Sequence, residues 1–121
     1  MFAVWDAYID VLKEWALGRP HVRRPGGESG HEFFARFDAA VATIADAGHG
    51  AALLVSHGAA LRTWLSGRGN DLTPAEVSRR RLGNTAIVAL EGDPDAWRLV
   101  DWDDGVHRDT LAGRAPAGPA A

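Results

Sequence analysis

The sequence contains no cysteine, which excludes a disulfide framework and any metal site built on thiolates. It has no apolar run of the roughly 18 to 20 residues that a membrane-spanning helix requires. Residues 1–15 lack the basic start and the small-residue cleavage site of a signal peptide. The net charge is only -3, so no excess of charge indicates a nucleic acid or a membrane surface as partner. These absences predict a soluble, cytoplasmic protein with no nucleic-acid or membrane partner.

Length and composition indicate one folded domain followed by a short tail. A chain of 121 residues that is 46% hydrophobic is long enough to form a single core, and a second domain is not expected. From about residue 109 onward the chain consists mainly of alanine, glycine and proline. Such a segment cannot bury enough apolar surface to order itself. We therefore expect a domain over residues 1–108 and a disordered tail over residues 109–121.

Apolar residues at spacings of three and four predict amphipathic helices over residues 2–17 and 30–47. Ser29, followed three residues later by Glu32, forms a capping box at the start of the second helix. The intervening residues 18–27 are rich in arginine, glycine and proline and should form a loop. A helix should also begin after Ser56-His57-Gly58, where the helical period returns. A short helix should start at Thr73-Pro74, with Glu76 completing its capping box.

Three strands are expected, near residues 51–56, 84–91 and 96–102. Residues 51–55 form a short uninterrupted apolar run, which is typical of a strand buried on both faces in a parallel sheet. The other two strands flank residues 92–95, whose length and residue types suit a hairpin turn. The pattern as a whole predicts an α/β fold with a small sheet and flanking helices.

The Ser56-His57-Gly58 sequence lies at the turn between the apolar strand and the next helix. In open α/β sheets, ligands gather at the carboxyl ends of strands, where helix N-termini favour anions. Gly58 permits a close approach of the backbone, and His57 can donate a ring N–H to a phosphoryl oxygen. Arg62, five residues later, can hold a phosphate with its planar guanidinium. The alternative is a turn histidine bonded to the backbone and an arginine solvated on a helix face.

Several motifs, taken together and in order, resemble the second half of the histidine phosphatase superfamily, whose members are phosphoglycerate-mutase-like. They are Pro25-Gly26-Gly27-Glu28-Ser29, Arg36, Ser56-His57-Gly58, Arg62 and Leu82-Gly83-Asn84-Thr85. The similarity covers about residues 5–102. It implies a partial three-layer α/β/α fold of the phosphoglycerate-mutase type. It also implies an activity in which a phosphate monoester transfers its phosphoryl group to a histidine in an Arg-His-Gly motif.

The resemblance assigns roles to individual residues. It implies that His57 is catalytic, as the second histidine of the pocket, which holds the transferring phosphoryl group. Ser56, Gly58, Arg62 and Arg36 are implied to bind the substrate phosphate, although Arg36 could equally pair with Glu32 one turn earlier. No cofactor is implied. The histidines lack the i, i+4 spacing of a zinc pair, so no metal is expected.

One part of the family pattern is missing from the sequence. It contains no Arg-His-Gly motif, and Glu28 matches a loop glutamate of the family rather than its general acid. The domain is therefore expected to be incomplete and inactive on its own, with a phosphorylated small molecule as its ligand. The alternative is a non-catalytic module that binds phosphorylated ligands or another protein.

The missing motif also has a structural consequence. In the family, the strand that carries it lies beside the strand that ends here at Val55. Its absence should leave an apolar sheet edge exposed, and such edges recruit another chain or aggregate. We expect this edge to pair with a missing N-terminal segment or with a second copy of the chain.

Overall fold

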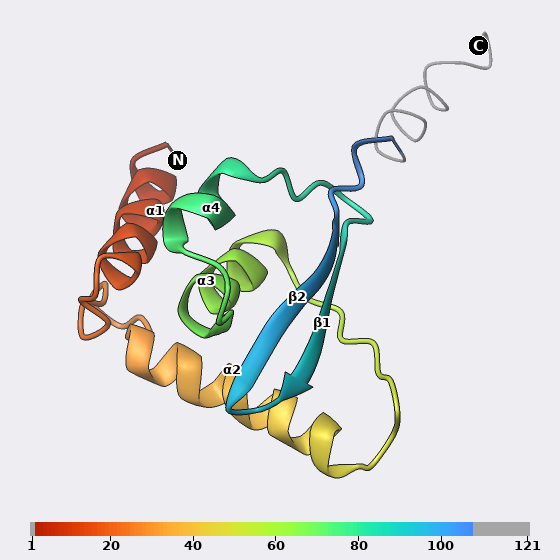
Figure 1. The fold of residues 1–121 in the computed structure, drawn as a ribbon. Coiled ribbons are helices and arrows are strands. Elements are labelled where there is room, and N and C mark those ends of the chain that lie inside the picture. The colour runs from red at the N-terminus through yellow and green to blue at the C-terminus, as the bar shows by residue number, and fades with distance from the viewer. Residues whose placement is uncertain (1, 108–121) are drawn as a thin grey trace, which may run out of the picture.

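The computed structural model describes residues 2–107, and the side chains of residues 7–107 within that range. The expected tail at residues 109–121 lies outside the described residues. The elements, shown in Figure 1, are α1 (Phe2–Ala16), α2 (Gly30–Asp46), α3 (Gly58–Arg68), α4 (Pro74–Arg79), β1 (Ile87–Asp93) and β2 (Ala96–Asp103). None of these helices is both long and apolar enough to cross a membrane, as judged over the described residues.

Two capping boxes fix the starts of α2 and α4. The Ser29 hydroxyl accepts a 3.2 Å hydrogen bond from the Glu32 amide, and the Glu32 carboxylate accepts one from the Ser29 amide. Thr73 and Glu76 make the same reciprocal pair, with proline at the first position of α4. Both predicted helix starts are confirmed, because each cap depends only on residues three apart in the sequence.

The strands β1 and β2 form a two-stranded antiparallel hairpin, with Ile87 opposite Asp103 and Asp93 opposite Ala96. The first strand begins three residues later than expected at residue 84. Thr85 has a positive φ of 65°, and the Ala86 amide donates to the Gly83 carbonyl at 3.1 Å. Residues 83–86 therefore form a turn rather than the start of the strand.

The core joins α2, α3, α4 and the hairpin. Its buried residues are Phe33, Phe37, Trp64, Leu65, Leu72 and Val77. The rings of Phe37 and Trp64 stack with centroids 5.2 Å apart, and the ring centroid of Trp97 of β2 lies 6.5 Å from that of Trp64. Large aromatic side chains bury extensive area, so this row of rings anchors α3 between α2 and the hairpin.

Residues 51–56 do not form the expected third strand. Among residues 2–107, the sheet contains only β1 and β2, and no backbone hydrogen bond joins residues 51–56 to another segment. Leu53 and Val55 are 79% and 86% exposed, although Leu54 packs against the core. A strand exists only where a neighbour accepts and donates its ladder hydrogen bonds, and β1 and β2 pair with each other. The four helices and the two-stranded sheet agree with a partial α/β fold of the phosphoglycerate-mutase type.

Candidate functional site

His57 is the N-cap residue of α3, with extended backbone angles of φ -98° and ψ 153°. Its carbonyl accepts the Leu61 amide at 2.9 Å, which closes the first turn of the helix. Its side chain is exposed and makes neither a capping hydrogen bond nor a bond to any other described residue. The structure therefore does not show a turn histidine bonded to the backbone. Both ring nitrogens are available to a ligand.

The first turn of α3 is open above Gly58. A Cβ atom at this position would meet nothing closer than the Leu82 carbonyl oxygen, 3.9 Å away. The backbone angle φ of Gly58 is not positive, so the turn does not require glycine for its conformation. Glycine instead leaves this face of the turn bare, and the free N–H groups of a helix N-terminus can face an anion there. Ser56, which precedes the turn, is half-buried.

Arg62 is tied to α4. Its Nη1 donates a 2.7 Å hydrogen bond to the Val77 carbonyl, and its side chain is partly buried. This contact differs from the alternative of an arginine solvated on a helix face. The bond uses one of the five guanidinium donors, and no carboxylate among the described residues forms an ion pair with Arg62. The remaining donors can bind a ligand.

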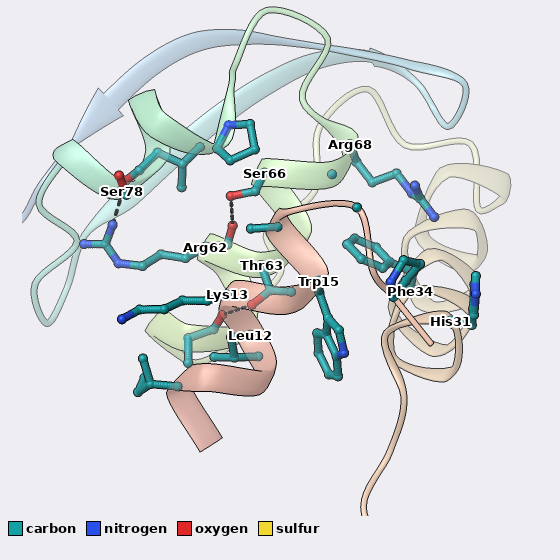
Figure 2. A pocket seen from close by; sticks show the side chains of 18 of the residues that line it. Leu12, Lys13, Trp15, His31, Phe34, Arg62, Thr63, Ser66, Arg68 and Ser78 are labelled. Carbon is teal, nitrogen blue, oxygen red and sulfur yellow. Dashed lines mark hydrogen bonds between the residues drawn. The ribbon is translucent and has the colours of Figure 1, made fainter. Parts of the chain in front are cut away.

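Arg62 and Gly58 line a cavity of about 1030 Å³ that α1, α2, α3 and α4 surround. Figure 2 shows this cavity, with Lys13 of α1 and Arg62 extending toward the same side of it. His57 and Ser56 are not among its lining residues. Of the five predicted site residues, the structure therefore brings only Gly58 and Arg62 together at one cavity.

Arg36 lies at a different place and is already paired. Its Nε and Nη2 donate to the two Glu28 oxygens at 3.0 and 2.9 Å, a bidentate ion pair. The hydrogen bond from Arg36 lowers the pKa of Glu28, and the pair raises the pKa of Arg36. Glu32, the partner considered from the sequence, instead pairs with Arg23 at 2.9 Å. The partner of Arg36 is thus Glu28 and not Glu32, because the loop brings Glu28 back over α2. Helical spacing alone does not reveal this.

Arg36 and Glu28 line a smaller cavity of about 450 Å³. Leu12, Trp15, Ala59 and Thr63 line both cavities, so the two cavities adjoin where α1 packs against α3. Neither cavity contains a metal site, because no three histidine, aspartate or glutamate residues within residues 2–107 gather in a cluster that could hold an ion.

Lys13 is a lining residue that the sequence analysis missed. It belongs to the last turn of α1 and looks like an ordinary polar residue of an amphipathic helix. The signal was its position four residues after Ile9, which places both on one helix face. Both side chains line the larger cavity.

The comparisons with known proteins agree with the motifs. The family model of the histidine phosphatase superfamily (branch 1) matches residues 2–105, which include every motif and almost all of the described chain. No curated protein and no solved structure matches the chain significantly. The family match alone covers well over half of the sequence. The chain thus belongs to the histidine phosphatase superfamily.

Proposed function

We propose that this chain is a domain for phosphoryl transfer from phosphate monoesters, incomplete and inactive on its own. The observation that carries the proposal concerns the His57 side chain. It is exposed at the start of α3 and forms no hydrogen bond with a described residue. Family membership supports the class of reaction. Its ligand would be a phosphorylated small molecule, and the protein would work in the cytoplasm without a cofactor.

In this proposal His57 donates a ring N–H to an oxygen of the transferring phosphoryl group. The amides of the first turn of α3 and the free donors of Arg62 add to the binding of that charge. Preorganised donors of this kind each contribute on the order of a few kcal/mol to phosphoryl transfer. They hold and stabilise the group, but none of them replaces the missing nucleophile.

The nucleophile would come from another polypeptide segment that carries an Arg-His-Gly motif. A nitrogen of that histidine would attack phosphorus, the P–O ester bond would break, and the leaving alkoxide would take a proton from a general acid that the same segment supplies. Water then hydrolyses the phosphohistidine and releases phosphate. The sequence contains no such motif, which is the reason for expecting no turnover by the chain alone.

The test combines inorganic phosphate binding, measured by titration calorimetry, with hydrolysis of a generic aryl phosphate at mildly acidic pH. We expect phosphate to bind, and His57→Ala to weaken binding by roughly 10- to 150-fold, since a hydrogen bond to a charged group contributes about 1.5 to 3 kcal/mol. His49→Ala is the matched control, because His49 is also exposed but lies in the turn after α2. No hydrolysis is expected from any variant.

Two results would contradict the proposal. Absence of phosphate binding, or equal binding by His57→Ala and the wild type, would remove His57 from the site. Hydrolysis that disappears in His57→Ala would show that the chain carries out the transfer itself, and the inference of an incomplete domain would be wrong.

A specific observation also favours a second function, that of a protein-interaction module. Residues 51–56 expose an apolar, unpaired backbone within the described chain, with Leu53 and Val55 pointing to solvent. Such a segment can add a strand from another chain, through main-chain hydrogen bonds. The partner would be either a segment that supplies the missing strand or a second copy of this chain.

A further inference from the structure

Two cationic side chains without a carboxylate partner line the larger cavity. Lys13 and Arg62 both contribute to its lining, and neither forms an ion pair with a described residue. In Figure 2 both side chains extend toward the same side of the cavity. Unpaired positive charges that converge on one cavity attract an anion, and Arg62 can bind it through several donors.

The opposite side of the cavity is apolar and aromatic. Trp15 and Phe34 lie across from Lys13 and Arg62 in Figure 2, and Leu12 adds an aliphatic side chain. The Trp15 indole N–H is already donated to the Val22 carbonyl at 2.7 Å. Phe33 stacks on one face of Trp15 and the Arg68 guanidinium lies over one face of Phe34, so a ligand would meet the other face of each ring. A phosphate ion alone would leave this wall exposed to water, whereas an apolar group would cover it.

Most of the remaining polar side chains of the cavity are already engaged. Thr63, Ser66 and Ser78 donate their hydroxyl protons to backbone carbonyls at 2.7 to 2.9 Å. Asp38 and Arg68 form an ion pair with each other at 2.8 Å. His31, also in the lining, is exposed. The unpaired charges available to a ligand are thus those of Lys13 and Arg62.

The size of the cavity fits the same conclusion. Its volume of about 1030 Å³ is just above the usual range for small-molecule pockets, roughly 300 to 1,000 Å³. A lone phosphate would fill a small part of it. A ligand that matches both halves has an anionic group at Lys13 and Arg62 and an apolar, ring-containing part against Trp15 and Phe34.

We propose that this cavity binds a phosphate monoester with an aromatic organic group, and that Lys13 is a phosphate-binding residue beside Arg62. The inference rests on the proposed function, because Arg62 and Gly58 belong to both. It adds the substrate class and one binding residue. The aromatic group gains from burial and from offset stacking on the rings of the wall, which favours it over a polar group.

The test compares phenyl phosphate, glycerol phosphate and inorganic phosphate as ligands, by titration calorimetry on the full chain. Phenyl phosphate should bind at least 10-fold more tightly than glycerol phosphate. Lys13→Gln should weaken the binding of phenyl phosphate about 10-fold. Arg79→Gln, which removes an exposed charge outside the cavity, should leave this binding unchanged. Ala16→Leu, at an exposed lining position, should weaken the binding of phenyl phosphate but leave the affinity for inorganic phosphate unchanged.

A spectroscopic readout separates a direct role of Lys13 from a general loss of charge. Lys13 is the only lysine in the sequence, so reductive ¹³C-methylation gives one side-chain signal besides the N-terminus and keeps its charge. We expect that signal to shift on addition of phenyl phosphate, with saturation at the calorimetric affinity.

The two proposals fail in different ways. Absence of inorganic phosphate binding would contradict the proposed function itself. If phosphate binds but phenyl phosphate binds no more tightly than glycerol phosphate, the aromatic ligand is wrong. If phosphate binds while Lys13→Gln has no effect and the Lys13 signal does not move, the role of Lys13 is wrong and the proposed function stands.

Discussion

The indole N–H of Trp64 donates a 2.8 Å hydrogen bond to Asp38. The Asp38 carboxylate also accepts hydrogen bonds from Nε and Nη2 of Arg68. Trp64 is only 4% exposed, whereas the Arg68–Asp38 pair lies at the surface. Burial acts to raise the pKa of Asp38, but the hydrogen bonds from Arg68 and Trp64 outweigh it, so its pKa lies below the ordinary 3.8. One carboxylate thus joins the aromatic core to a surface ion pair.

Asp38→Asn should therefore change how stability depends on pH. Because the folded state lowers the pKa of Asp38, its contribution is complete above pH 3.8 and is lost as the pH falls through the folded value. At pH 7 the variant should lose about 1 kcal/mol, a modest effect because the ion pair is solvated. Urea unfolding at pH 7 and pH 3, followed by tryptophan fluorescence, measures both. Asp46→Asn, at an exposed residue that forms no ion pair among the described residues, is the control. Equal acid sensitivity in wild type and Asp38→Asn would contradict the linkage.

Gly30 and Gly58 occupy the first position of α2 and α3, yet alanine should have opposite effects at the two sites. A Cβ at Gly30 would come within 2.8 Å of the Pro20 carbonyl oxygen and 2.9 Å of Trp15. Gly30→Ala should therefore destabilise the fold by about 1 to 3 kcal/mol, in spite of the helix propensity of alanine. A Cβ at Gly58 would meet nothing closer than 3.9 Å, so the free energy of unfolding of Gly58→Ala should be within about 0.5 kcal/mol of the wild-type value.

Gly58→Ala should nevertheless weaken phosphate binding, because its methyl group covers the bare first turn of α3. Thermal unfolding and phosphate calorimetry on the two variants separate these effects. A stable Gly58→Ala variant with wild-type phosphate affinity would mean that the anion does not approach this turn. A Gly30→Ala variant as stable as the wild type would show that Pro20 and Trp15 can shift.

The features that the sequence predicted well are those set by neighbouring residues. Ser29 with Glu32, and Thr73 with Glu76, are three residues apart, so their capping boxes form whenever the helix forms. The hairpin likewise depends on a two-residue turn between β1 and β2. Local hydrogen-bond geometry is sufficient in each case, and tertiary packing does not overturn it.

The features that the sequence did not predict depend on segments far apart in the chain. Arg36 pairs with Glu28 because the glycine-containing loop folds back over α2, with Gly26 at a φ of 76°. Residues 51–56 have the composition of a buried strand, but pairing needs a neighbour that the described chain does not provide. Lys13 reaches the cavity only through the packing of α1 against α3. Hydrophobic periodicity identifies the buried face of a helix or strand, but it does not identify which segment packs against that face.

The Glu28–Arg36 pair makes a testable prediction about anion binding. If Arg36 holds substrate phosphate, the ligand must compete with the Glu28 carboxylate for the same guanidinium. Glu28→Gln removes that competing charge, so phosphate affinity at pH 7 should rise several-fold, while Arg36→Gln should lower it. The gain should shrink in acid, because Glu28 in the wild type is protonated as the pH falls through its lowered pKa. Unchanged affinity in both variants would make Arg36 a structural partner of the loop and nothing more.

The exposed segment before α3 provides the last prediction. Leu53 and Val55 are 79% and 86% exposed, so Leu53→Lys combined with Val55→Lys should leave the free energy of unfolding within about 0.5 kcal/mol of the wild type. The same change should suppress self-association, because lysines on an open strand edge repel a second strand. Light scattering over a range of chain concentrations measures this, and Leu54→Lys is the contrast, since Leu54 packs on the core and its replacement should destabilise the fold. A wild-type chain that remains monomeric at every concentration would exclude pairing with a second copy, and a separate segment would then be the partner for these residues.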